Sequence, residues 1–376
     1  MPKNIVILFD GTSNEISADR TNILRLYGTL KKSEDQVVWY DPGVGTIGLA
    51  WLGIWRKFIE IFGLATGFGL DKNVKEAYRF LVESYQRDEN GARDRIFIFG
   101  FSRGAYSARV LAGFIHAFGL MEKRNLNLLD YVYRAYKRIG EGGNEDAFSE
   151  MRLFERTLRA DRPPIRMLGL FDTVASVIET GRFGLRLKSN AHTSTNSSVQ
   201  SVRHAVAIDE RRTMFEPMLW PETQDYSANR FDTSKSEPQD AKEVWFRGVH
   251  GDVGGGYPEA SSALAKVPLA WMISEAKETE LQFVTRTVND LVLGRAEKYV
   301  PPNAHAKHHD SMTFGWSFVE LLPRKLRSHS KRPRLLGLSI PLKEWRWIPP
   351  GAKIHRSVEQ AGYHPPNVPD TFDFVD

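Results

Sequence analysis

The chain has 376 residues, of which 41% are hydrophobic and 11% aromatic, enough for a globular core in one large α/β domain or in two smaller ones. It has no cysteine, which excludes disulfides, a thiolate nucleophile and cysteine-ligated zinc or iron–sulfur centres. The formal net charge of +5 is modest for this length, so any attraction to phosphate or anionic lipid must come from local clustering.

The first predicted element is a buried strand at Asn4–Phe9, whose apolar run is too short for a signal peptide. It ends in a turn-rich stretch that begins Asp10-Gly11-Thr12. Loops at the carboxyl ends of parallel strands build sites, so we expect Gly11 or Thr12 to offer a backbone N–H to an oxyanion. The alternative is a simple turn in which Asp10 caps a helix. A helix over 22–30 and a strand over 36–40 then lead into a second loop on the same edge.

Residues 47–70 are apolar, aromatic and rich in glycine. Trp51, Trp55 and Phe58 can share one helical face, which predicts a lid or an interfacial helix in peripheral contact with a membrane. A buried helix that covers the sheet is the alternative. No segment reaches eighteen uncharged apolar residues, so we expect no membrane span. The next predicted helix is capped by Asp71 and runs to about residue 86.

A strand meets a helix at a serine in the centre of the sequence. Ile96–Phe99 is wholly apolar, as in a strand buried on both faces, and apolar residues at helical spacing resume from Tyr106. The pentapeptide between them, 100–104, fits G-x-S-x-G, a strained turn that holds Ser102 up as a nucleophile. The helix dipole and the backbone N–H of Arg103 would help to stabilise an oxyanion.

An acidic residue follows a later predicted strand. Residues 120–160 are helical and polar and predict an insertion or cap, after which 166–171 is typical of a buried strand and ends at Asp172. An acid at this place fits the chain order serine, aspartate, histidine of one class of serine hydrolase. A capping or turn aspartate is the alternative. Residues 180–198 predict a loop. The charged segment 209–212 is expected at a salt-linked surface, with contact to the rim of the site as the alternative.

The candidate base is His250, which follows a predicted strand at 244–246 and lies among five glycines. Such glycine density allows a close backbone approach at a strand's end. We therefore expect His250 to take the proton of Ser102, oriented by Asp172. Asp252 could instead orient the histidine or bind a metal, and a packed histidine in a turn is the structural alternative.

The last third of the chain is less regular. An amphipathic helix is predicted at 264–283, and 301–376 is expected to be an irregular C-terminal segment packed on the domain. The histidines at 305–309 could bind a metal, but their surroundings favour an exposed loop. The basic residues of 324–334 could attract anionic lipid. A solvated loop is the default expectation for them. They lack the interleaved aromatics of a nucleic-acid platform, so no nucleic-acid partner is expected.

Six ordered motifs together resemble the α/β-hydrolase family that includes type VI secretion phospholipase effectors. They are FDGTSN (9–14), DPGVGT (41–46), GFSRGAYSAR (100–109), GLFDTVAS (169–176), VWFRGVHGDVGGGY (244–257) and IHRSV (354–358). Ser13 departs from the family's pattern, because it stands where a tryptophan is usual in FDGTWN. The chain is also short, with little room for the long membrane-binding additions of the effectors.

The resemblance implies a single α/β-hydrolase-like catalytic domain over 1–376, with a mostly parallel sheet flanked by helices and lid or cap insertions at 47–70 and 120–160. It implies a serine esterase or phospholipase that acts on an ester or phospholipid. The implied triad is Ser102, Asp172 and His250, with no cofactor and no metal. It also implies export by a contact-dependent secretion system, with an immunity or secretion partner, of a chain that is cytoplasmic as synthesised.

Two other classes of function stay open on the sequence. A metal-dependent phosphoesterase could use Asp10, His250 and Asp252. A non-catalytic binding module on the same fold is the other. A serine-directed fluorophosphonate would label only the serine hydrolase. Loss of activity in a chelator, with no effect of the fluorophosphonate, would favour the metal-dependent phosphoesterase.

Overall fold

The computed structural model describes residues 2–11, 20–43, 68–140, 153–154, 156–158, 160–174, 177–181, 184–188, 190–229, 233–323, 329–330, 332–334 and 338–376. Thr12 and the part of the expected lid over 47–67 lie outside the described residues, as does 141–152 of the expected cap.

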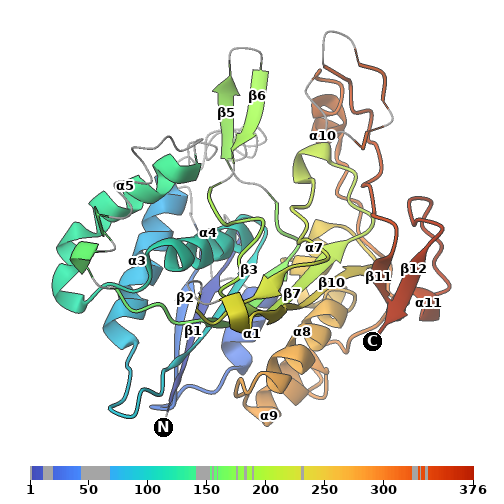
Figure 1. Ribbon diagram of the computed structural model, residues 1–376. Helices are drawn as coiled ribbons and strands as arrows, with labels where there is room; N and C mark the ends of the chain where they lie inside the picture. The colour runs from blue at the N-terminus through green and yellow to red at the C-terminus, as the bar shows by residue number, and fades with distance from the viewer. Residues whose placement is uncertain are drawn as a thin grey trace, which may run out of the picture.

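The described strands form an eight-stranded parallel sheet in the order β12-β11-β10-β7-β4-β3-β1-β2 (Figure 1). The predicted α/β fold with a mostly parallel sheet is therefore confirmed. All the carboxyl ends meet at one edge, which is where such sheets build their sites. The strands are β1 (Asn4–Phe9), β2 (Gln36–Asp41), β3 (Arg95–Phe101), β4 (Ile165–Phe171), β7 (Val199–Ala207), β10 (Asp240–Phe246), β11 (Ala352–His355) and β12 (Phe372–Val375).

Helices cover both faces of this sheet (Figure 1). The alternation of β1 shows why its whole run is apolar: Ile5 and Ile7 pack into one core cluster, and Val6 and Leu8 into the other. The first cluster contains side chains of α3 (Phe68–Ser84), α4 (Arg103–Phe118) and α5 (Leu129–Gly140). The second contains side chains of α1 (Asn22–Thr29), α8 (Lys266–Glu278) and the short π-helix η6 (Val288–Val292), which follows α9 (Thr285–Thr287).

The described part of the expected cap belongs to the first helical layer. Helix α3 begins three residues before Asp71, which lies in its first turn instead of capping it. The Asp71 carboxylate accepts hydrogen bonds from Lys137 and Tyr133 of α5. Because α5 also buries Val132 and Tyr136 against the core, it is tied to α3 along its length. A six-residue 3-10 helix, η2 (Lys123–Leu128), precedes it.

Two segments are more regular than expected. The stretch predicted as a loop contains most of a hairpin of β5 (Val177–Gly181) and β6 (Gly184–Lys188). The C-terminal segment supplies β11 and β12 to the main sheet and carries α10 (Phe314–Val319) and α11 (Ser357–Gln360). Strands of four residues are too short to show an apolar period, which is why the sequence did not reveal them. The minor elements are α7 (His250–Gly254), β8 (Asp225–Tyr226), β9 (Glu237–Pro238), η3 (Thr213–Phe215), η4 (Thr233–Lys235) and η5 (Glu259–Ser261).

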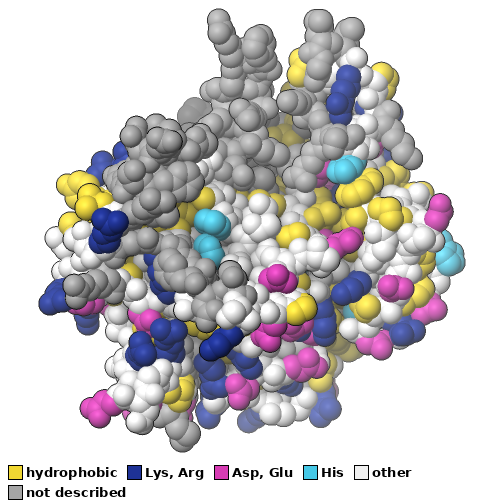
Figure 2. Space-filling model, viewed as in Figure 1, with side chains coloured by type: hydrophobic (Ala, Val, Ile, Leu, Met, Phe, Trp, Pro, Cys, Tyr) yellow, Lys and Arg dark blue, Asp and Glu magenta, His cyan; other side chains and the backbone are white. Residues whose placement is uncertain are grey.

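The hairpin β5–β6 and helix α10 both stand on the side of the sheet's carboxyl edge (Figure 1). On the described surface of the face in Figure 2, acidic and basic side chains are interspersed and no broad region of one sign stands out. Among the described residues, no helix combines the length and the apolar character that crossing a membrane requires.

Candidate active site

Ser102 lies in a strained turn between β3 and α4. Its backbone has φ 58° and ψ −121°, a region that residues with a side chain rarely adopt. The turn closes because two glycines let backbones touch. A Cβ on Gly100 would lie 2.4 Å from the carbonyl oxygen of Gly104, and a Cβ on Gly104 would lie 2.4 Å from the carbonyl oxygens of Phe9 and Asp10. The elbow is therefore wedged against the end of β1.

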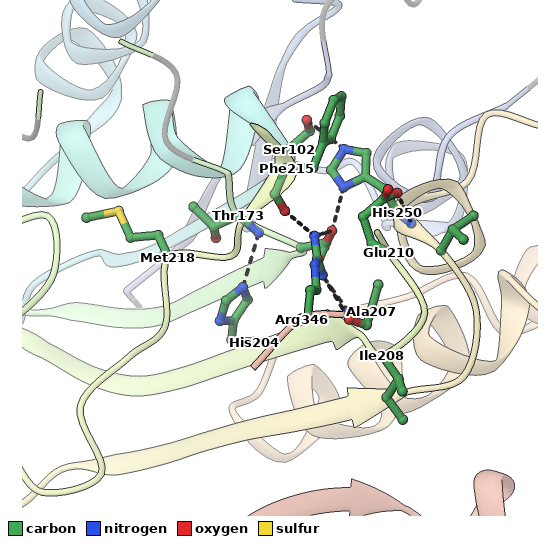
Figure 3. A network of polar contacts seen from close by, with 12 residues as sticks. Ser102, Thr173, His204, Ala207, Ile208, Glu210, Phe215, Met218, His250 and Arg346 are labelled. Atoms are coloured by element: carbon green, nitrogen blue, oxygen red, sulfur yellow. Dashed lines mark hydrogen bonds and ion pairs between the residues drawn. The ribbon is translucent and has the colours of Figure 1, made fainter. Parts of the chain in front are cut away.

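The structure brings Ser102, His250 and Asp172 into one hydrogen-bonded chain (Figure 3). Nε2 of His250 lies 2.8 Å from Oγ of Ser102, and Nδ1 of His250 lies 2.5 Å from Oδ2 of Asp172. The three residues are 8%, 7% and 0% exposed in the order Ser102, His250, Asp172. An imidazole held between a hydroxyl and a buried carboxylate can accept a proton from the hydroxyl.

Parallel strands supply all three groups from the same edge of the sheet. Asp172 follows β4 directly and has a positive φ of 40°. Its backbone N–H donates to the carbonyl of Ala205 in β7 (2.7 Å), and its Oδ1 accepts from the N–H of Ala207 (3.0 Å). His250 begins α7, four residues after the last residue of β10. The turn before it needs Gly248, whose φ is +106° and whose Cβ would lie 2.3 Å from Asp252.

Aromatic rings enclose the imidazole of His250. The ring of Phe101 lies 4.7 Å from it, and that of Phe215 lies 5.0 Å from it at a steep angle. Trp316 of α10 packs edge-on against Phe215, with 5.4 Å between ring centres. These rings keep water from the imidazole and place apolar surface beside Ser102.

A buried arginine that the sequence analysis missed holds the Asp172 carboxylate. Nη1 of Arg346 lies 2.7 Å from Oδ1 of Asp172, and Nη2 lies 2.9 Å from Oδ2 (Figure 3). The same guanidinium donates to the carbonyl oxygens of Ala207 and Phe215. No local pattern marks Arg346, because the residue with which it pairs lies 174 positions earlier.

Burial and charge set the ionisation of the pair. Burial raises the pKa of Asp172, but the Arg346 cation and the His250 hydrogen bond outweigh it, so this pKa lies well below its usual range. Burial lowers the pKa of His250 below its ordinary value of 6.5, although Asp172 acts in the opposite direction. The folded chain therefore holds a carboxylate beside a neutral imidazole at neutral pH.

Comparison with known proteins supplies the family. The model of the family described as "T6SS, Phospholipase effector Tle1-like, catalytic domain" matches residues 3–275. The chain belongs to this family.

The similar proteins are longer than this chain. The uncharacterised protein YEL023C of Saccharomyces cerevisiae is 34% identical over an alignment of 232 residues, and the match covers 58% of this chain and 33% of the yeast protein. An uncharacterised protein from Pseudomonas aeruginosa has a crystal structure that is 20% identical with a TM-score of 0.41, over 80% of this chain and 48% of that one. The Tle1 effector bound to the VgrG spike of the type VI secretion system is 20% identical with a TM-score of 0.35, over 70% of this chain and 53% of that one.

The family match ends at residue 275, so Arg346 and α10 lie beyond it. They nevertheless reach the serine site of this family member, through Asp172 and Phe215. The site thus combines residues of the matched region with residues of the C-terminal segment.

Glu210 also lies at the site. The segment 209–212 was expected at a salt-linked surface, with the rim of the site as the alternative; Glu210 is fully buried and accepts a hydrogen bond from the backbone N–H of His250 (3.2 Å). Burial raises its pKa, but paired hydrogen bonds from Arg212 outweigh this and lower the pKa to about 2. Arg212 lies over the ring of Phe215, so this ion pair forms the wall of the site beside His250.

Asp252 does not contact the imidazole of His250. Its Oδ1 lies 2.6 Å from Nδ1 of His309, and its Oδ2 accepts from the backbone N–H groups of Val249 and His309. Asp172 holds His250 instead. Asp252 therefore fixes the start of α7 and ties it to the C-terminal segment.

The metal site considered as an alternative, with Asp10, His250 and Asp252 as ligands, is not formed by the described residues. In the part of the chain that the structure describes, no three His, Asp or Glu side chains are grouped as metal ligands. Oδ2 of Asp10 accepts from the hydroxyls of Thr21 (2.6 Å) and Tyr40 (2.8 Å). Of the histidines at 305–309, His309 is stacked on Tyr257. Asp10 and Asp252 thus serve local hydrogen bonds.

Of the expected oxyanion donors, the N–H of Arg103 lies beside Ser102, whereas that of Gly11 is already hydrogen-bonded. Arg103 is the first residue of α4, so its backbone N–H lies at the amino end of that helix beside Ser102. The N–H of Gly11 donates to the carboxylate of Asp10 (2.7 Å), so in this conformation it does not point to a reacting oxygen. Thr12 lies outside the described residues.

His204 is a second buried histidine near Asp172, and it has a structural role. Its Nε2 accepts from the N–H of Thr173 (3.1 Å), which requires the proton on Nδ1, where it is shared with Glu243 (2.8 Å). Both ring nitrogens of His204 are thus hydrogen-bonded, and the bond to Thr173 fixes the backbone that follows Asp172 (Figure 3).

Proposed function

We propose that this chain is a serine hydrolase that cleaves the carboxylic esters of lipids by acyl transfer through Ser102. The hydrogen-bonded chain of Ser102, His250 and Asp172 at a strained strand-to-helix turn carries this proposal. The family described as a phospholipase effector catalytic domain supports the reaction class.

In the proposed reaction, Nε2 of His250 takes the proton of Ser102 as Oγ attacks the ester carbonyl. The N–H of Arg103 and the dipole of α4 stabilise the oxyanion. The imidazolium then gives its proton to the leaving alcohol. Water, deprotonated by His250, releases the acid from Ser102, and Asp172 holds the imidazole tautomer throughout.

The surroundings of His250 support a lipid substrate. Phe101 and Phe215 line the reacting groups, and Trp316 continues this apolar surface into α10. Beyond Trp316 the side chains of Phe314 (93% exposed) and Phe318 (63% exposed) are open to solvent. An acyl chain that leaves the serine along this surface would meet apolar groups.

Delivery and partners are part of the same proposal. The family description implies export by a type VI secretion system, and with it a secretion or immunity partner. Peripheral contact with a membrane through 47–70 remains a prediction, because residues 44–67 are outside the described part.

The test is fluorophosphonate labelling of the wild type and of Ser102→Ala, read by intact mass. Labelling that is lost with Ser102 supports the proposal, and hydrolysis of p-nitrophenyl esters should then increase with acyl length, with phospholipid as the final substrate. Ser201, a buried serine near the start of β7, at the opposite end of that strand from the contacts with Asp172, serves as the matched control in Ser201→Ala, where labelling should persist. Equal hydrolysis by Ser102→Ala would refute the serine mechanism.

A further inference from the structure

We propose that Arg346 is a positioning residue for the reaction at Ser102, holding the Asp172 carboxylate in the plane that His250 requires. This inference rests on the proposed function and adds to it a residue from outside the family match. Arg346 touches no reacting atom and acts through Asp172.

The geometry of the pair fixes the carboxylate. The two Nη atoms of Arg346 meet the two Oδ atoms of Asp172 at 2.7 and 2.9 Å, the parallel arrangement in which a guanidinium determines the plane of its partner. Oδ2 is also the atom that binds His250, and Oδ1 also accepts from Ala207. Rotation of the carboxylate about its Cβ–Cγ bond would break several of these bonds together.

Arg346 is itself held from several sides. Its guanidinium donates to the carbonyls of Ala207, at the end of β7, and of Phe215, whose ring packs against His250. Its own backbone carbonyl accepts from Nδ2 of Asn367, which also donates to the carbonyl of Ile208. With only 7% of its surface exposed, the arginine is fixed between β7 and the C-terminal segment.

Because Arg346 is charged, its removal should change the pH dependence of the reaction rate, which the removal of a merely structural residue would not do. The charged groups around His250 are Asp172 with Arg346 on one side, and Glu210 with Arg212 on the other. Removing the Arg346 cation leaves the Asp172 charge unopposed, which favours the imidazolium and also makes Asp172 easier to protonate. Both effects move the acid limb of the rate profile to higher pH.

The experiment measures fluorophosphonate labelling rates of the full chain between about pH 4.5 and 8.5, about two units on either side of an ordinary histidine pKa. Each rate is divided by the fraction of the sample that is labelled at completion. In Arg346→Met we expect a rate about 100-fold below the wild type, the scale of a misplaced catalytic group, and an acid limb at higher pH. Arg346→Lys keeps the positive charge but cannot make the paired hydrogen bonds to both Oδ atoms of Asp172. Its labelling rate should therefore be intermediate, and the acid limb of its pH–rate profile should stay in place.

Arg203→Met is the matched control. Arg203 is also a buried arginine with carboxylate partners, Glu275 and Asp240, but it has no contact with Asp172 or His250 among the interactions of the described residues. It should lower thermal stability and leave the rate per labelled molecule and the acid limb unchanged.

The outcomes separate this inference from the proposed function. A wild type that does not label overturns both. A labelled wild type whose rate and acid limb are reproduced by Arg346→Met overturns the role of Arg346 alone. If Arg346→Met does not fold, Arg346→Lys decides: a reduced rate with an unmoved acid limb supports the positioning role, and the wild-type rate refutes it.

Discussion

Nδ1 of His309 lies 2.6 Å from Oδ1 of Asp252, so the acid nearest to His250 in the sequence has its partner elsewhere. This pair makes the two aspartates separable by experiment. Asp172→Asn should reduce kcat by about 10,000-fold, because an amide beside Nδ1 favours the wrong tautomer of His250. Asp252→Asn should change kcat by less than about threefold, since an amide oxygen can still accept from the backbone of Val249.

Asp252→Ala is the companion variant, because it leaves buried N–H groups without an acceptor. It should lower the free energy of unfolding by about 1–3 kcal/mol, measured by urea denaturation. A loss of activity in Asp252→Asn as large as that in Asp172→Asn would contradict the assignment.

The contact between Gly104 and β1 predicts that the elbow admits no larger residue. A Cβ there would press on the carbonyls of Phe9 and Asp10, both at 2.4 Å, so Gly104→Ala should cost about 1–3 kcal/mol of stability and slow labelling of Ser102. Gly28→Ala, in α1, is the control, because a Cβ there would meet only Leu291 of η6, at 3.5 Å. It should be neutral or raise stability by up to about 1 kcal/mol. Equal thermal unfolding midpoints of the two variants would refute the tight packing of Gly104 against β1.

The positive φ of Ser102 predicts that a side chain at this position lowers the stability of the fold. Ser102→Gly should be more stable than Ser102→Ala by about 1 kcal/mol, because glycine adopts φ 58° without the strain that a Cβ causes. Both variants should be inactive. In Ser107, a regular residue of α4, the order should reverse, with glycine less stable than alanine by about 1 kcal/mol. Calorimetry of the four variants checks this, and a Ser102→Gly chain that melts below Ser102→Ala would exclude strain.

The environment of His250 predicts the pH dependence of the wild type. Burial lowers the pKa of His250, while Asp172 and Glu210 raise it and Arg212 lowers it. The neutral base therefore persists below pH 6.5, and kcat/KM should rise through one ionisation centred below 6.5 and stay level above it. The stability that this neutral histidine contributes should likewise be present above pH 6.5 and be lost as the pH falls through its lowered pKa.

Glu210→Gln tests the sign of this prediction. It removes a negative charge that raises the pKa of His250, so the acid limb should move to still lower pH. An acid limb centred above pH 6.5 in the wild type would show that charge and not burial dominates the pKa of the imidazole. An acid limb that moves upward in Glu210→Gln would contradict the sign assigned to the Glu210 charge.

Much of the serine site could be predicted because its signals are local. The apolar run Ile96–Phe99 marks a buried strand, and the glycines at 100 and 104 mark the turn that raises Ser102. Asp172 and His250 each follow a strand, and a parallel sheet gathers the carboxyl ends of its strands. Their hydrogen bonds in the structure agree with that expectation, while their catalytic roles remain a proposal.

The sequence by itself therefore determined the parallel α/β fold and the approximate places of the serine, acid and histidine, because strand period, turn glycines and chain order are properties of neighbouring residues. Only the tertiary structure decided that Asp172 and not Asp252 faces His250, that Glu210 is buried, and that Arg346 joins the site. These depend on which side chains meet across the carboxyl edge of the sheet. Arg346 and Asp172 are 174 residues apart, and no local pattern encodes a contact between an acid and a base so far separated.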